Sequence, residues 1–290
     1  MRLDDSRESS NVEDRRSSGG GGGGFGVGKG TVGIGTIVLA LVAMYFGVDP
    51  SVVLNMAGQG GGGVTQQQAA GPRGAPADAE GQFVAKILGE TEDTWRAVFK
   101  QQTTGAYKEP TLVLFRGATP TACGTGQSAM GPFYCPPDQS VYIDLAFFQE
   151  MKNKLNAPGD FAQAYVIAHE VGHHVQNLLG TMDRVNKQRG AQPNRANELS
   201  VRLELQADCY AGIWANKANA ARQIVQEGDI EEALGAATAV GDDTLQRKTQ
   251  GRVVPESFTH GSAAQRVSWF KRGWQQGTLG ACDTFANAQR

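Results

Sequence analysis

The chain has 290 residues, a formal net charge of −2 and 40% hydrophobic residues, so it can build one sizeable core with appendages. The near-neutral charge, without a basic stripe interleaved with aromatic residues, argues against nucleic acid as a partner. The four cysteines contain no CxxC pair, which argues against a zinc ribbon or a thioredoxin-like redox site.

The first residues are polar and glycine-rich. Residues 1–18 carry charges of both signs without apolar periodicity, and an uninterrupted glycine run follows at Gly19–Gly24. We therefore expect residues 1–29 to form a flexible cytoplasmic tail. Gly26–Thr31 resembles a phosphate-binding loop with Lys29 as its cation, but a glycine run precedes it and an apolar run follows it. Nucleotide binding is therefore a minor alternative.

The segment Gly30–Val48 contains no charged residue and has nearly the ~20 residues that a membrane-spanning helix needs. We expect one transmembrane helix, with a cleaved signal peptide or a buried helix as alternatives. Cations precede the segment and an acidic residue follows it, which favours a cytoplasmic N-terminus and an extracytoplasmic domain. These charged residues are Arg15, Arg16, Lys29 and Asp49.

Residues 49–80 are rich in Gly, Gln and Pro and are predicted to form a linker, which leaves 81–290 as the folded domain. Apolar residues in 82–102 recur at helical spacing, with an interruption at Gly89. The domain is therefore expected to begin with an amphipathic helix.

Two short β-rich runs bounded by Pro and Gly, Thr111–Arg116 and Ser140–Asp144, are predicted strands. Between them lies a glycine-rich excursion from Cys123 to Cys135. A disulfide between these two cysteines would close a short loop and contribute ~3 kcal/mol by restricting the unfolded chain. Free buried thiols are the alternative.

A short helix is predicted over 145–155, followed by a longer one over 160–180. At the start of the longer helix, Asp160 followed by Gln163 fits a capping box. Gly180 lies where a left-handed C-terminal residue is expected.

This longer helix carries His169, Glu170 and His173 in an HExxH arrangement. At about 100° per residue the three side chains share one arc, so two imidazoles can bind one metal ion while the carboxylate faces the ion's bound water. The alternative is a pair of hydrogen-bonded core histidines. Gln176 and Leu179 exclude the extended HExxHxxGxxH pattern, so the third ligand must lie elsewhere.

Asn197–Asn216 is predicted to form a second helix on which Glu204 and Asp208 are four residues apart and face the same side. We expect Glu204 to be the third ligand and Asp208 to accept a hydrogen bond from a ligating histidine, although the two could exchange roles. The alternative is two solvated acids. Cys209 could pair with Cys282 and hold the C-terminal segment beside this helix, although other connectivities and an apolar filler role remain open.

The last predicted helix is Ser262–Gln276, with Ser262 and Gln265 as a possible capping box. His260 immediately precedes it and is a candidate catalytic hydrogen-bond donor to an oxyanion, or equally a structural turn residue. His174 is rotated by about 100° from His173, so it is expected to support a ligand through a hydrogen bond or to be structural, and not to bind the metal itself.

Four segments together resemble the bacterial putative neutral zinc metallopeptidase family, which belongs with the HExxH metallopeptidases called zincins. They are HEVGHHVQ, ELQADCYAG, FTHGSAAQR and the opening NVEDRR. The resemblance implies an α+β, zincin-like peptidase domain with a central HExxH helix, a small β-sheet and a helical C-terminal half. It also implies a protein of the bacterial cell membrane, and similarity to gluzincins implies the roles of Glu204 and Asp208.

The expected activity is peptide-bond hydrolysis. One Zn²⁺ bound by His169, His173 and Glu204 would lower the pKa of its water toward ~7, and Glu170 would take the proton as that water attacks a peptide carbonyl. The substrate is expected to be a peptide or protein. The rival function is a non-catalytic, membrane-tethered binding or assembly protein that keeps zinc for structure.

Overall fold

The computed structural model describes residues 1–17, 71–74 and 76–286. The apolar run at 30–48, the glycine loop at 26–31 and most of the expected linker lie outside these ranges. Within the described residues, no helix combines the length and the apolar character needed to cross a membrane.

A four-stranded sheet forms one side of the core, in the order β1-β2-β6-β5. Its strands are β1 Val12–Asp14, β2 Thr111–Phe115, β6 Ser140–Asp144 and β5 Phe133–Cys135. The first three run parallel, whereas β5 is antiparallel to β6 and forms an edge. The strands predicted from the β-rich runs are therefore confirmed.

Both faces of this sheet are covered, which explains why β2 reads as a nearly continuous apolar run. Leu112 and Leu114 face the large core that the helices share. Val113 and Phe115 face a small second cluster with Tyr142.

The glycine-rich excursion between β2 and β6 folds into a hairpin of β3 Ala118–Thr121 and β4 Gly124–Gln127, followed by a short 3-10 turn and β5. A disulfide joins Cys123 to Cys135, with 5.9 Å between the Cα atoms, as predicted. This disulfide links the β3–β4 hairpin to β5 at the edge of the four-stranded sheet.

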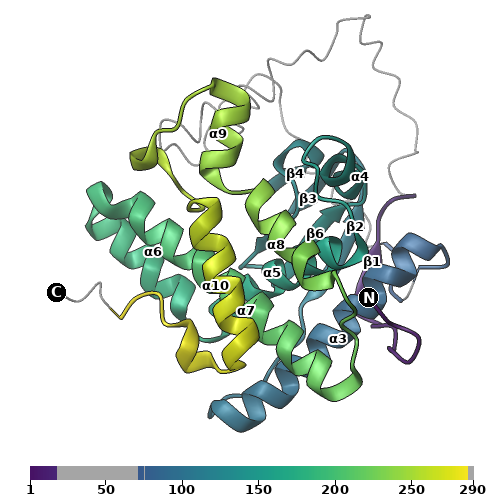
Figure 1. The fold of residues 1–290 in the computed structure, drawn as a ribbon. Coiled ribbons are helices and arrows are strands. Elements are labelled where there is room, and N and C mark those ends of the chain that lie inside the picture. Colours follow the sequence, from purple (N-terminus) through teal and green to yellow (C-terminus); the bar gives the residue numbers. More distant parts are fainter. Residues whose placement is uncertain (18–70, 75, 287–290) are drawn as a thin grey trace, which may run out of the picture.

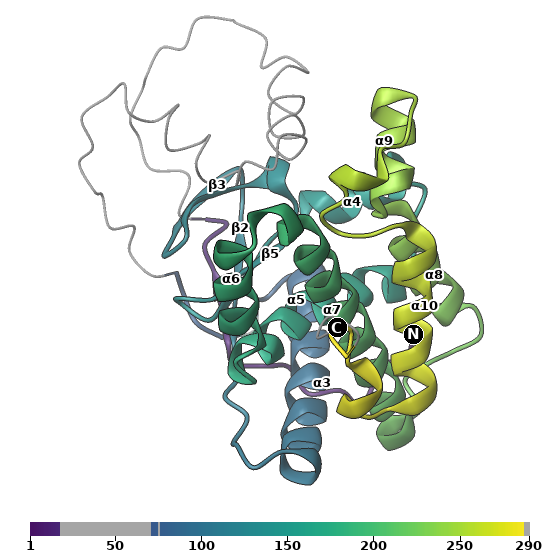
Figure 2. The same cartoon turned by 90° about the vertical axis from the view of Figure 1, so that its left-hand side faces the viewer.

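The rest of the described chain is mostly helical, which makes the fold mixed α+β. The helices are α3 Ala79–Gln102, α4 Ala146–Asn153, α5 Asp160–Leu178, α6 Thr181–Ala191, α7 Ala196–Arg222, α8 Asp229–Ala239, α9 Asp242–Gln250 and α10 Ala263–Gln276. Helix α5 lies in the centre of the molecule and contacts the sheet, α3, α7 and α8 (Figure 1). Helix α7 packs against both α5 and α10 (Figure 2).

The capping box predicted at the start of α5 is wrong. Gly159 occupies the N-cap position, and the carboxylate of Asp160 instead binds the amino group of Met1 at 2.8 and 2.9 Å. A carboxylate from α8, that of Glu232, accepts a hydrogen bond from the backbone N–H of Phe161 at 3.0 Å. At the other end of α5, Gly180 is left-handed with φ of 69°, as predicted.

The expectation of a flexible tail is wrong for residues 1–17, because they fold into the domain. β1 is paired with β2, and Val12 is fully buried in the main core. The sequence obscured this because the charges on the segment are partnered rather than solvated: Arg7, for example, binds Glu92 and Asp93 of α3.

Helix α3 continues without a break through Gly89, where an interruption was expected. The backbone of the N-terminal segment crosses α3 at this point, and a Cβ on Gly89 would lie 2.5 Å from the carbonyl oxygen of Arg7. The glycine therefore allows close contact rather than a break. The helix also begins at Ala79, capped by the side chain of Asp78, so the domain reaches into the segment predicted as a linker.

Helices α7 and α10 approach each other at two glycines. A Cβ on Gly212 would overlap the backbone of α10, and a Cβ on Gly273 would overlap the carbonyl oxygen of Cys209. A disulfide between Cys209 and Cys282 holds the C-terminal segment against α7. α7 is thereby fixed where it meets α5, and this contact positions the polar residues described next.

Candidate metal centre

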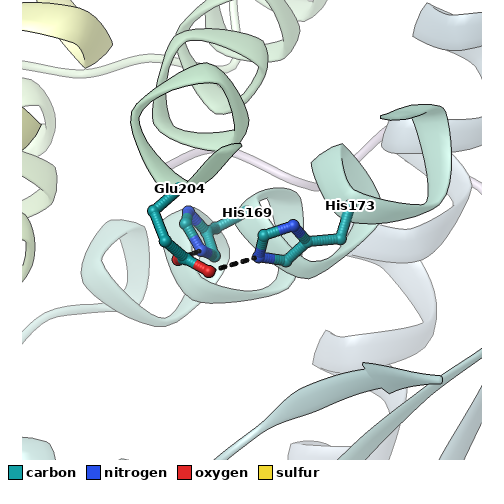
Figure 3. A group of neighbouring side chains, drawn as sticks. All are labelled: His169, His173 and Glu204. Carbon is teal, nitrogen blue, oxygen red and sulfur yellow. Dashed lines mark hydrogen bonds and ion pairs between the residues drawn. The ribbon is translucent and has the colours of Figure 1, made fainter. Parts of the chain in front are cut away.

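Three side chains from two helices converge at the contact between α5 and α7 (Figure 3). Nε2 of His169 lies 3.1 Å from one carboxylate oxygen of Glu204, and Nε2 of His173 lies 3.5 Å from the other. One potential ligand atom from each of the three residues falls within 4.8 Å of the other two. The tertiary structure thus brings together the three residues predicted as ligands.

The far nitrogen of each imidazole faces an oxygen acceptor. Nδ1 of His169 lies 2.9 Å from Asp208 Oδ1, and Nδ1 of His173 lies 2.9 Å from Gln176 Oε1. The amide nitrogen of Gln176 donates to the carbonyl oxygen of Leu203 at 2.7 Å, which turns its oxygen toward His173. Both rings are therefore oriented with Nδ1–H donating outward and Nε2 toward Glu204.

This donor set fits a divalent metal ion such as zinc. With their protons on Nδ1, the Nε2 atoms of His169 and His173 direct lone pairs at a carboxylate that also offers only lone pairs. A cation between them satisfies all three groups, and two imidazoles with one carboxylate are a common ligand set for zinc.

Without a metal ion, protons bound to the histidines can balance the negative charge of Glu204. Burial lowers the pKa of His169, but the Asp208 charge and the hydrogen bonds to Asp208 and Glu204 outweigh burial and raise it to about 10. Burial raises the pKa of Glu204, but the neighbouring His173 and His169 hold it well below its ordinary value. The site thus favours an ionised Glu204 beside a positively charged group.

Asp208 is fully buried and is held by two residues that sequence reasoning missed, Arg266 and Tyr165. Arg266 donates to both carboxylate oxygens of Asp208 at 2.8 and 2.9 Å, and the Tyr165 hydroxyl donates to Oδ1 at 2.5 Å. Burial raises the pKa of Asp208, but Arg266 and His169 outweigh it and lower the pKa to about 2. Tyr165 stands four residues before His169, so helical spacing was a signal for it, whereas Arg266 had none beyond its place on a predicted helix.

A cavity of about 590 Å³ opens over the three converging residues. Glu170 lines it from α5, and Arg266 and His260 line it from the C-terminal part of the chain. The rest of the wall includes large apolar side chains, namely Met130, Phe133, Phe147, Val166, Leu203 and Leu245. The cavity lining therefore combines charged residues with a larger apolar part.

His260 is held at the edge of this cavity by Asp242, another residue that the sequence did not indicate. The backbone N–H groups of Thr259, His260 and Gly261 all donate to Asp242 Oδ2, at 2.8, 2.7 and 2.9 Å. Nδ1 of His260 lies 3.3 Å from Asp242 Oδ1. Burial lowers the pKa of His260, but Asp242 and Glu204 outweigh it and raise the pKa. The predicted capping box of Ser262 and Gln265 is present, and it begins two residues after His260.

His174 points away from the converging ligands. Its ring lies between the Tyr134 hydroxyl at 2.9 Å and the carbonyl oxygen of Lys108 at 2.6 Å. Burial lowers its pKa to about 4, so the ring is neutral and connects α5 to the strand side of the core. The structure agrees with the structural role predicted for it.

The family model described as "Putative neutral zinc metallopeptidase" matches residues 1–285. The chain belongs to this family. It is 50% identical to the uncharacterized protein YpfJ of Escherichia coli K12, over 99% of this chain and all of the relative. It is 44% identical to the uncharacterized protein Mb2605 of Mycobacterium bovis, over 85% of this chain and 86% of the relative.

No solved structure matches the chain. Membership of this family supports a zinc peptidase function at the level of the family as a whole. The match begins at residue 1, so it covers the N-terminal strand that the structure places in the sheet.

Proposed function

We propose that this protein is a zinc-dependent peptidase whose metal ligands are His169, His173 and Glu204. The observation that carries the proposal is the convergence of two Nε2 atoms and one carboxylate at the floor of a cavity lined by Glu170. The hydrogen bonds to Asp208 and Gln176 orient the imidazoles for a metal, as outer-shell acceptors do in other zinc sites.

A zinc ion held by these three residues would supply Lewis acidity and would lower the pKa of a bound water molecule toward ~7. Glu170 follows His169 directly on α5 and lines the cavity, so its carboxylate is placed to take the proton of the attacking water. It then passes that proton to the amine that leaves as the peptide bond breaks. Glu170 is therefore proposed as the general base.

His260 is proposed as the donor that stabilises the developing oxyanion. Its Nδ1 faces Asp242 and Thr259, so Nε2 is the ring nitrogen left for a substrate in the cavity. Asp242 raises the pKa of the ring, which favours the protonated, donating form. Asp242 acts through His260 and is a positioning residue.

The cavity favours catalysis over a purely structural zinc. Structural zinc sites are closed by four protein ligands, whereas catalytic sites have three and keep one position open to water and substrate. Among the described residues, the three grouped here face a cavity wide enough for a peptide side chain. A peptide or protein is therefore the proposed substrate.

We further propose that the catalytic domain is extracytoplasmic and associated with the bacterial membrane. Two disulfides, Cys123–Cys135 and Cys209–Cys282, account for all four cysteines, and disulfides persist mainly outside the reducing cytoplasm. The uncharged run at 30–48 is the proposed membrane-binding segment.

Replacing Glu170 by Gln tests the peptidase activity. The variant should retain one zinc per chain by metal analysis yet lose cleavage of a casein-type substrate. Glu227→Gln, at an exposed position away from the cavity, is the matched control and should match wild type. Wild-type turnover by Glu170→Gln would refute the assigned base. Stoichiometric zinc without hydrolysis of any peptide in a library, by the wild-type protein, would instead support the non-catalytic binding or assembly function.

A further inference from the structure

The N-terminal segment is an integral part of the zinc-site domain. Ser9 Oγ and Asn11 Nδ2 donate to Glu92 of α3 at 2.6 and 2.8 Å, and Glu92 is fully buried. β1 then adds a parallel strand to the sheet in register with β2. Residues 1–17 therefore pack against α3 and β2, which are brought together only when the domain folds.

The described residues that follow the interval 18–70 lie beside the same strand, β1. Asp14 N–H donates to the carbonyl oxygen of Pro72 at 3.0 Å, and Gly74 N–H donates to that of Val12 at 2.9 Å. Gly71 N–H donates to the Glu13 carboxylate at 2.8 Å. The residues on the two sides of the interval 18–70 are thus joined by direct hydrogen bonds.

A single membrane crossing between these points is incompatible with that geometry. The hydrocarbon core is about 30 Å thick, so one crossing would place β1 and residues 71–74 on opposite sides of it. Two crossings would need about 40 apolar residues, whereas 18–70 contains one uncharged apolar run, 30–48, of about half that length. The strand pairing therefore excludes an odd number of membrane crossings between residues 17 and 71. The length of the apolar run 30–48 excludes two crossings.

The charges that suggested a cytoplasmic N-terminus have another role. Arg15 Nε lies 2.7 Å from the Glu13 carboxylate, and Arg16 pairs with Asp14 at 2.6 Å and with Asp78 at 2.5 Å. The guanidinium of Arg16 thereby joins β1 to the N-cap of α3. Both arginines form ion pairs within the folded domain, so Lys29 is the one cation of the three that still favours a cytoplasmic N-terminus.

We propose that residues 1–17 and the zinc-site domain lie in the same compartment, on one side of the membrane. The single-pass anchor with a cytoplasmic tail, expected from the sequence, would separate these two parts and is incompatible with their pairing. The proposal does not depend on peptidase activity, since it follows from strand pairing and chain length alone.

Sidedness can be tested with the full-length protein in bacterial spheroplasts. Glu8→Cys and Lys187→Cys each add one thiol at an exposed position, in the N-terminal segment and in the domain. A membrane-impermeant maleimide should label both variants alike, either before lysis or only after it, while a cytosolic thiol protein reports spheroplast integrity. Labelling of one variant before lysis and of the other only after lysis would overturn the proposal.

Discussion

The carboxylate of Asp208 lies between His169 and Arg266. Its Oδ1 is 2.9 Å from Nδ1 of His169, and its Oδ2 is 2.8 Å from Nε of Arg266. Because all three side chains are buried, the charge of Asp208 is balanced by that of Arg266 within the protein. Asp208 can therefore orient the imidazole without remaining an unpaired buried charge.

This arrangement predicts that Asp208→Asn weakens zinc binding by about 10- to 100-fold, a typical cost of losing an outer-shell acceptor. The amide keeps the size of the side chain, but it loses the negative charge and leaves Arg266 unbalanced. Competition with a chelator of known affinity measures the change. Asp183→Asn, at an exposed position on α6, serves as the control. Equal zinc affinities in the two variants would show that Asp208 does not orient a ligand.

The stability of the metal-free protein should fall as the pH rises above neutrality. The folded state raises the pKa of His169 from 6.5 to about 10. Its contribution to the free energy of unfolding is therefore fully present below pH 6.5 and is lost as the pH rises toward 10. Thermal unfolding of chelator-treated protein should show a falling Tm across this window. With zinc bound the imidazole is neutral, so the zinc-loaded protein should show a smaller decline, and equal slopes would contradict the assignment.

Replacing His260 by Ala should lower kcat about 10²-fold while the zinc content stays at the wild-type level, because the ring is proposed to act on the oxyanion and not on the metal. Asp242→Asn should lower kcat less and move the alkaline limb of the pH–rate profile to lower pH, because Asp242 raises the pKa of His260. Steady-state kinetics with metal analysis separates the two effects. Full activity of the His260→Ala variant would show that this histidine has only a structural role, in the turn that precedes α10.

The close approach of α7 and α10 predicts a glycine requirement at Gly273. A Cβ there would overlap the Cys209 carbonyl, so Gly273→Ala should lower the free energy of unfolding by about 1–3 kcal/mol. Gly190→Ala on α6 is the matched helical control, because a Cβ at that position would have no heavy atom of another segment within 4 Å, and it should be neutral or slightly stabilising. Urea unfolding of both variants measures the difference, and equal midpoints would contradict the packing argument.

The Cys209–Cys282 disulfide closes a loop with a sequence separation of 73 residues. By the chain-entropy relation, replacing both cysteines by Ala should cost about 4 kcal/mol of stability. The same change at Cys123 and Cys135, 12 residues apart, should cost about 3 kcal/mol. Chemical unfolding under non-reducing conditions provides the comparison. A larger loss at the shorter loop would show that local strain or packing, and not loop length, decides the effect.

Local patterns predicted those parts of the fold that depend on neighbouring residues. The β-rich runs became β2 and β6, the HExxH helix became α5, and Ser262 with Gln265 caps α10. These features follow from side-chain periodicity and capping, which a sequence displays directly. The capping box at Asp160 failed because a distant group, the amino terminus, competes for its carboxylate.

By itself, the sequence determined the chemistry that α5 can offer, because HExxH places two imidazoles and a carboxylate on one helical arc wherever that helix lies. Only the tertiary structure decided which carboxylate completes the group, how Arg266 balances Asp208, and that residues 1–17 belong to the sheet. Each of these depends on contacts between segments far apart in the chain. Such contacts are set by how the helices and strands pack, and no local pattern of residue types encodes them.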